Sequence, residues 1–221
     1  MAAVIAREVR DGWRVGIGVN SAIPAAGVLL ARETHAPSIA IRMRGLDDAV
    51  PFVGSKEFFD LAQRGKLDLF FLSGVQIDAQ GRINLHSAGG RRFPGAFGSA
   101  VLYQVVQRVI LFRTEHSPRS LVERVEFATA AGRPHLVVTP KAVLEPGADG
   151  RLELRSWHPG ETPESVQAAT GFELELRPGA METPPPTAEE LSVLRERVYP
   201  RLAVAFPRFV ESTIPVLDPN P

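Results

Sequence analysis

The chain contains no cysteine and no excess of charge of either sign. The absence of cysteine excludes disulfides, thiolate metal ligands and cysteine nucleophiles, and a protein that needs no disulfides fits a reducing cytoplasm. Lys plus Arg number 25 and Asp plus Glu number 25, so the basic excess typical of proteins that coat nucleic acid or anionic lipid is missing. No window approaches the roughly 18 uncharged apolar residues of a membrane span, and residues 1–14 carry scattered charges in place of a signal-peptide run. We therefore expect a cytoplasmic protein without a nucleic-acid or membrane partner.

What the chain does contain is enough apolar material for a complete core. Of its 221 residues 44% are hydrophobic and 23% are charged, which is the composition of a globular protein. That length predicts a single domain over residues 1–221. Gly and Pro number 19 each, so many tight turns are expected. A net charge of +0 is poor for solubility and favours a chain that lives in an assembly.

The first half of the chain alternates strand-like and helix-like segments. The expected strands are residues 13–19, 38–43, 68–72 and 109–112, and the expected helices begin at Ser21 and Ser55 and at residue 100. A hairpin is expected over residues 75–85, and a glycine-rich loop over residues 87–99. This rhythm predicts an α/β fold with an open, mostly parallel sheet flanked by helices.

The later chain is richer in predicted strands. Strands are expected at residues 135–139, 143–145, 152–157 and 172–176, with a short helix opened by Thr162 and Pro163. Thr187 and Glu190 have the spacing of a capping box, which predicts a helix to about residue 198. The four prolines of residues 207–221 predict an extended C-terminal arm after that helix.

Short motifs taken one at a time leave the function open. Gly16-x-Gly18 fails as a dinucleotide fingerprint, because the third glycine would fall at Ser21. No G-x-S-x-G elbow is present, and no two histidines have metal-ligand spacing. Ser73 and Gly74 follow a buried strand, where α/β folds place ligand loops, but an ordinary turn fits them equally well. Residues 87–92 offer backbone amides and two guanidinium groups to an anion, and a surface loop is the simpler interpretation.

Taken in order, these segments resemble the β subunit of family I coenzyme A transferases, the glutaconate CoA-transferase type. The pattern G-x-Q-x-D-x-x-G-x-x-N, from Gly74 to Asn84, is similar to the family's hairpin. The segment from His158 to Val166, H-P-G-x-T-x-E-x-V, is the most specific, and Thr170-Gly171-Phe172 follows it. Gly89 and Gly90 fall where the family's glycine-rich loop lies. The resemblance covers roughly residues 13–199.

The resemblance implies an α-subunit partner in a hetero-oligomer and an acyl-CoA thioester as substrate, with no metal and no tightly bound cofactor. In such enzymes a glutamate of the β subunit attacks the thioester, and an anhydride and then a glutamyl-CoA thioester follow. Backbone amides stabilise the tetrahedral oxyanion.

This chain departs from the family at that glutamate. The resemblance implies a Glu-Ser-Gly or Glu-Asn-Gly turn after the second strand, and the glutamate's position falls near Arg44. The residues there read Arg42-Met43-Arg44-Gly45, and the first carboxylates are Asp47 and Asp48. Arginine stays protonated and cannot act as a nucleophile.

Three functions therefore compete. The first is CoA transfer with the nucleophile displaced or unneeded. The second is hydrolysis of an acyl-CoA-linked ring, since a steroid-ring-opening branch of this family lacks the β-subunit glutamate and uses one from its α subunit. The third is a non-catalytic subunit that completes a partner's site.

The expected site combines residues of several loops. Arg42 and Arg44 share a strand face and are candidates to bind a substrate carboxylate or the CoA phosphates, with solvent exposure as the alternative. The resemblance places Ser73, Gly74 and Gln76 along the pocket, and Gly89 and Gly90 against the oxyanion or acyl group. The catalytic residue itself is left unassigned.

Overall fold

A computed structural model of the chain describes residues 1–46, 49–50, 54–96 and 98–217. Its backbone divides into two compact units. The first unit comprises Met1–Leu61, Lys66–Leu69 and Pro186–Pro221, and the second comprises Ala62–Gly65 and Phe70–Pro185. Asp47 and Asp48, the nearest carboxylates after β2, lie outside the described residues.

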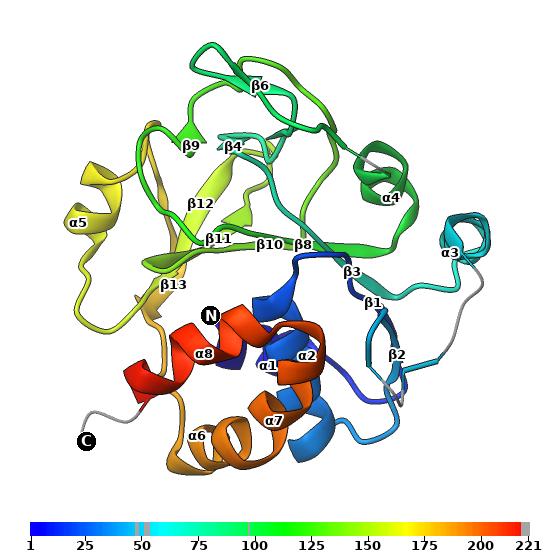
Figure 1. Cartoon of the computed structure of the whole chain (residues 1–221). Coiled ribbons are helices and arrows are strands. Elements are labelled where there is room, and N and C mark those ends of the chain that lie inside the picture. The colour runs from blue at the N-terminus through cyan, green and yellow to red at the C-terminus, as the bar shows by residue number, and fades with distance from the viewer. Residues whose placement is uncertain (47–48, 51–53, 97, 218–221) are drawn as a thin grey trace. The chain divides into compact units, whose positions relative to one another are not determined.

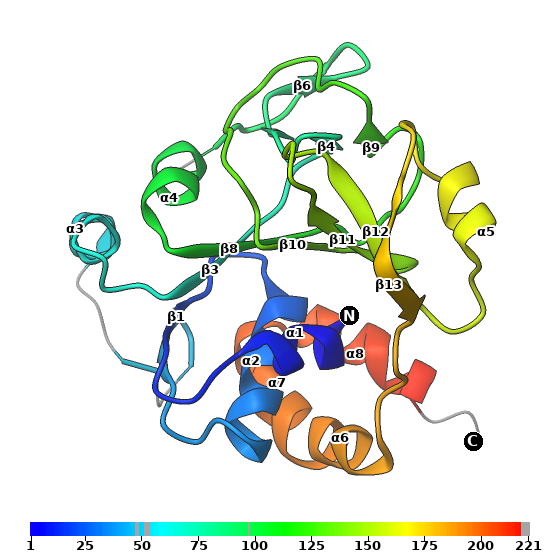
Figure 2. The ribbon, with the colours of Figure 1, turned by 180° about the vertical axis from the view of Figure 1, so that it is seen from behind.

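The first unit is a helical cluster with a pair of short parallel strands. Its elements, in chain order, are α1 (Ala2–Glu8), β1 (Arg14–Gly16), α2 (Ala22–Thr34), β2 (Ala40–Arg42), most of α3 (Gly54–Gln63), α6 (Ala188–Val193), the π-helical turn η1 (Leu194–Val198), α7 (Tyr199–Ala205) and α8 (Pro207–Leu217). Figure 2 shows α1, α2, α6, α7 and α8 gathered together. Helix α2 is the centre of this cluster, because every residue from Pro24 to Ala31 is buried.

Close packing and ion pairs hold the helices around α2. A Cβ on Gly27 would lie 2.6 Å from Ile5 Cγ2, so only glycine lets α1 approach α2 this closely. Arg7 donates to the Glu190 carboxylate at 2.7 and 3.0 Å and so joins α1 to α6. Glu33 of α2 pairs with Arg201 of α7 at 2.8 Å.

The C-terminal segment is helical, so the expected extended arm is wrong as far as Leu217. Helix α8 begins at Pro207, a position where the fixed φ and missing N–H of proline suit a helix start. The capping box at Thr187 is confirmed, since its hydroxyl accepts from the Glu190 N–H and the Glu190 carboxylate accepts from the Thr187 N–H.

The second unit is built on a long sheet. Its strands, in chain order, are β3 (Leu69–Leu72), β4 (Gln76–Asp78), β5 (Ile83–Asn84), β6 (Ser87–Ala88), β7 (Arg91–Arg92), β8 (Arg108–Phe112), β9 (Leu121–Val122), β10 (Leu136–Val138), β11 (Ala142–Pro146), β12 (Leu152–Trp157) and β13 (Leu176–Glu182). The long sheet runs β13-β12-β11-β10-β8-β3, and a small sheet runs β5-β4-β9. The helices of this unit are α4 (Ser99–Val105) and α5 (Pro163–Ala168).

The large sheet is mostly parallel, as the sequence predicts. Strands β1 and β2, β8 and β10, and β12 and β13 pair in parallel, while β11 runs antiparallel to both of its neighbours. Figure 1 shows β4, β6 and β9 on one side of β8 and β10, with α5 beside β12. The α/β class with a large, mostly parallel sheet flanked by helices is therefore confirmed. The last strand is displaced from its expected place at residues 172–176 to Leu176–Glu182.

Candidate functional site

The hairpin that carries the G-x-Q-x-D-x-x-G-x-x-N pattern forms as the sequence predicts. Strands β4 and β5 pair in antiparallel register, with Gln76 opposite Asn84. The turn between them is held by Asp78, whose carboxylate is fully buried and accepts from the backbone N–H groups of Gln80 and Arg82 at 3.0 Å. It also accepts from Arg82 Nε at 2.8 Å. A buried carboxylate with this many donors is a structural anchor for the turn.

Gly74 of the expected pocket is required by the fold of this hairpin. A Cβ at this position would lie 2.7 Å from the Gln76 carbonyl oxygen and 2.9 Å from that of Asn84. Such distances are excluded for a real side chain, so the glycine lets the chain pass directly against the hairpin backbone. Ser73, just before it, is partly exposed at the end of β3.

A chain of hydrogen bonds continues from the hairpin to a carboxylate that the sequence did not single out. Asn84 Nδ2 donates to Gln76 Oε1 at 2.8 Å, and Gln76 Nε2 donates to Glu126 Oε1 at 3.0 Å. The N–H of Gly89 then donates to both oxygens of Glu126, at 3.1 Å each. Gln76 and Asn84 are buried, whereas Glu126 and Gly89 are exposed. The structure thus brings Gln76 and Gly89 together through Glu126.

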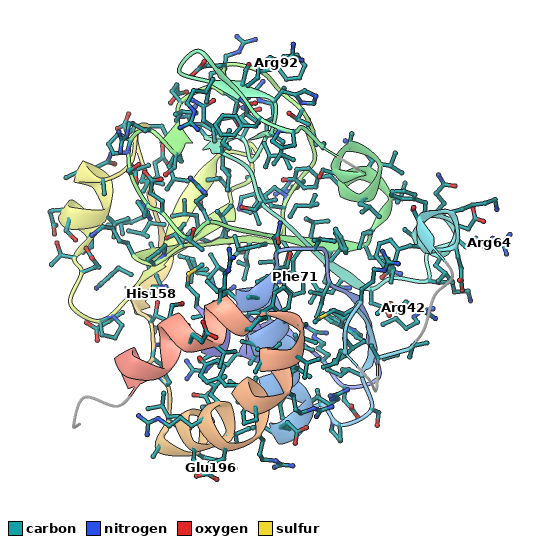
Figure 3. The ribbon with its side chains drawn as sticks, viewed as in Figure 1. Arg42, Arg64, Phe71, Arg92, His158 and Glu196 are labelled. Atoms are coloured by element: carbon teal, nitrogen blue, oxygen red, sulfur yellow. The ribbon has the colours of Figure 1, made fainter. Side chains whose placement is uncertain are left out.

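The segment expected as a glycine-rich loop contains a small hairpin. Strands β6 and β7 pair in antiparallel register, and Gly89 and Gly90 form the turn with φ of +57° and +76°. Positive φ at both central residues is the geometry of a hairpin turn that glycine favours. Arg91 and Arg92 follow on the exposed strand β7, and Figure 3 shows Arg92 at the outer end of this unit.

His86 precedes this hairpin and is fixed by its neighbours. Its Nδ1 lies 2.9 Å from Thr129 Oγ1, and its ring centroid lies 5.0 Å from that of Phe127. The backbone at Gly95 lies close to Nε2 of the His86 ring, since a Cβ on Gly95 would be only 3.1 Å from that nitrogen. The half-exposed Phe127 ring and the His86 ring therefore form an aromatic pair.

Arg42 and Arg44, the two arginines of the expected binding site, belong to the first unit. Arg42 is the last residue of β2, stands opposite Gly16 of β1 and is partly exposed; Figure 3 labels its side chain. Arg44 is exposed in the turn that follows, at Gly45 with φ of +79°. The buried Met43 between them fits the expected alternation, although the strand itself ends at Arg42. Residues 42–46 contain no carboxylate.

The histidines of the later chain are buried in a polar cluster. His116 Nδ1 lies 2.7 Å from Thr139 Oγ1, and its Nε2 lies 2.9 Å from Thr170 Oγ1. Burial lowers the pKa of His116 to about 4, and the nearby Lys141 charge acts in the same direction. His116 turns inward, whereas its neighbour Glu115 is exposed and accepts from the Ser117 hydroxyl at 2.6 Å.

His158, the first residue of the most specific motif, has a comparable setting. Its Nε2 lies 2.9 Å from the Thr139 carbonyl oxygen, and its Nδ1 lies 3.0 Å from Thr183 Oγ1. Burial lowers the pKa of this imidazole too. Both histidines are therefore neutral structural groups near pH 7. The motif also builds a confirmed helix start, since Thr162 and Ser165 cap α5 reciprocally.

Neither a metal centre nor a membrane span is found in the part of the chain that the structure describes. No three His, Asp or Glu side chains gather there as a metal site would require. No helix within the described ranges is long and apolar enough to cross a bilayer.

Comparisons with known proteins cover nearly the whole chain. The β subunit of glutaconate CoA-transferase from Acidaminococcus fermentans is 25% identical, over 90% of this chain and 91% of that protein. The β subunit of 3-oxoadipate CoA-transferase from Pseudomonas knackmussii is 27% identical, over 88% of this chain and 90% of that protein. The crystal structure of the decarboxylase AibA/AibB is similar with a TM-score of 0.80 and 27% identity, over 88% of this chain and 91% of the other. No protein-family model matches the chain.

The chain is therefore similar in sequence and fold to subunits of the CoA-transferase class of enzymes. Its curated relatives are B subunits of coenzyme A transferases, and the similarity includes the glutaconate CoA-transferase type. The resemblance stated from the motifs is thereby confirmed.

Proposed function

We propose that this chain is the β subunit of a hetero-oligomeric enzyme that acts on acyl-CoA thioesters without a nucleophilic carboxylate from the end of β2. The likeness to two CoA-transferase β subunits over about nine-tenths of their length supports the substrate class and an α-subunit partner. The observation that carries the proposal is the sequence Arg42-Met43-Arg44-Gly45 where the second strand ends. A guanidinium cannot attack a thioester, so the attacking group or base comes from elsewhere.

In this proposal Arg42 and Arg44 serve binding. A guanidinium suits a carboxylate or a phosphate because it offers several donors in a planar fork. Ser73, Gly74, Gln76, Gly89 and Gly90 remain the proposed lining of the acyl pocket. No metal and no tightly bound cofactor enter the proposed reaction, and the CoA thioester is its substrate.

A second candidate is decarboxylation of an acyl-CoA that carries a free carboxylate. The likeness to AibA/AibB, which is a decarboxylase, favours it, and an arginine in place of a nucleophile suits a substrate carboxylate. In such a reaction the C–C bond to the carboxylate breaks and its electron pair passes into the thioester enolate. CO2 leaves, and a proton replaces it on the carbon.

The test is activity of the chain co-expressed with its α subunit on a panel of acyl-CoA substrates, with and without an acceptor acid. Borohydride or hydroxylamine trapping is run in parallel. CoA transferred to an added acid, together with a label on a carboxylate of this chain, would contradict the proposal. Free CoA without an acceptor indicates hydrolysis, and CO2 with retention of the thioester indicates decarboxylation; neither labels this chain. If the complex turns over no acyl-CoA, the remaining interpretation is that this chain is a non-catalytic subunit.

A further inference from the structure

The β6–β7 hairpin needs an anchor outside its own strands. Each strand has two residues, and a two-stranded ribbon of this size is not stable by itself in water. At its base, Asn84 Oδ1 accepts from the His86 N–H at 3.0 Å, and the Phe93 N–H donates to the His86 carbonyl at 2.8 Å. At its tip, the described contact is the one from the Gly89 N–H to Glu126.

Glu126 holds two of the proposed pocket residues at once. Its Oε1 receives Gln76 Nε2 at 3.0 Å and the Gly89 N–H at 3.1 Å, and its Oε2 receives the same N–H at 3.1 Å. Hydrogen bonds to an ionised carboxylate are about twice as strong as neutral ones. Within the described residues Glu126 forms no ion pair, and the Gln76 amide and the Gly89 N–H stabilise its charge by donating to it.

The contact also fixes which way the Gln76 amide points. Gln76 Oε1 accepts from Asn84 Nδ2 at 2.8 Å and from the Glu126 N–H at 3.3 Å. Its Nε2 is therefore left to face an acceptor, which the Glu126 carboxylate supplies. A neutral amide at position 126 would keep one acceptor oxygen, but its NH2 group would replace the second oxygen and the negative charge would be lost.

We propose that Glu126 is a positioning residue, which holds the Gly89–Gly90 turn and the Gln76 amide in the geometry that the acyl-CoA substrate meets. This inference rests on the proposed function for its effect on turnover, and on the Gln76–Glu126–Gly89 hydrogen bonds for its structural content. No sequence motif predicts these contacts, because Glu126 lies 50 residues from Gln76 and 37 from Gly89 along the chain.

The test is a charge-exchange cycle in the complex with the α subunit. In Glu126→Gln an amide NH2 replaces one carboxylate oxygen and faces the Gly89 N–H or the Gln76 amide, donor against donor. In Gln76→Glu two carboxylates face each other. The double variant restores complementarity, because a carboxylate at 76 accepts from Asn84 Nδ2, from the backbone N–H at 126 and from the new amide at 126. That new amide's oxygen then accepts from Gly89. Glu123→Gln is the matched control, since Glu123 is exposed in the same segment and pairs with Arg151 at 2.8 Å.

Two readouts are taken. Hydrogen exchange of residues 87–93 reports the hairpin, and we expect about tenfold faster exchange in each single variant, with wild-type exchange in the double variant and the control. Turnover of the acyl-CoA substrate is expected to fall about tenfold in kcat/KM in Glu126→Gln. The double variant is judged by hydrogen exchange, because position 76 is itself part of the proposed pocket lining. Glu123→Gln should retain the activity of the wild type.

The two proposals fail in different ways. Unchanged exchange in Glu126→Gln, or no recovery of wild-type exchange in the double variant, would overturn the positioning role. Faster exchange without a loss of turnover would also overturn it, because the hairpin would then be irrelevant to the substrate. A wild-type complex without acyl-CoA activity would overturn the proposed function, while the exchange measurements would still decide whether Glu126 holds the hairpin.

Discussion

Acidification should destabilise the fold through His116, and the size of the effect follows from its surroundings. The imidazole is 8% exposed and lies between the Thr139 and Thr170 hydroxyls. Burial and the Lys141 ammonium lower its pKa from 6.5 to about 4. In the unfolded chain the same group titrates near its ordinary value. Between pH 6.5 and about pH 4 the His116 imidazole is protonated in the unfolded state and neutral in the folded state.

The sign and the magnitude follow from this difference. A group whose pKa is lowered by folding contributes its full stability above about pH 7, and that contribution is lost as the pH falls toward 4. A difference of about 2.5 pKa units corresponds to about 3 kcal/mol in total, and about 2 kcal/mol of it is lost by pH 5. His158 shifts in the same direction, because burial lowers its pKa as well.

The assay is urea unfolding of the wild type and of His116→Gln at pH 7, 6 and 5. At pH 7 the variant should be less stable by about 1–3 kcal/mol, because it loses a buried hydrogen bond. The gap should close as the pH falls, since only the wild type carries the His116 proton linkage. Carboxylates titrate in both proteins, so the difference between the two curves isolates the histidine. Two parallel curves would refute the reasoning.

Two further substitutions test the packing and the binding expectations. Gly74→Ala should destabilise the chain by about 1–3 kcal/mol, because its Cβ would lie 2.7 Å from the Gln76 carbonyl oxygen. Thermal unfolding measures the loss of stability. The control Gly12→Ala, with positive φ but open space around it, should cost only about 1 kcal/mol. Arg42→Ala and Arg44→Ala should each weaken acyl-CoA binding by the complex by about tenfold, the loss of one charge-assisted contact of about 1.5 kcal/mol; calorimetric affinities that match the wild type would remove both arginines from the binding site.

Local signals in the sequence decide the elements whose partners are close along the chain. The β4–β5 hairpin closes over four residues, and its turn is held by Asp78 through bonds two and four residues away. The capping boxes at Thr162 and Thr187 act within three residues. Because the partners of such interactions lie a few residues apart, short sequence motifs specify them, and the sequence predicts these elements correctly.

Elements that depend on distant neighbours are predicted less well. Strand β13 takes its register from β12, with Met181 opposite Ser156, and its own exposed residues carry no alternating pattern that would mark its bounds. The prolines within helix α8 favour an extended arm, although Pro207 fits the first position of a helix. In both cases packing outweighs local preference.

The sequence by itself determined the resemblance to coenzyme A transferase β subunits, the α/β class and the arginines at the end of β2, because each is visible in the order of residues. Only the tertiary structure decided that Glu126 receives Gln76 and Gly89, and that His116 turns inward to Thr139 and Thr170. These partners lie 23 to 54 residues apart along the chain. The physical reason is that buried and charged groups must find hydrogen-bond partners wherever the fold places them, and no local pattern specifies that choice.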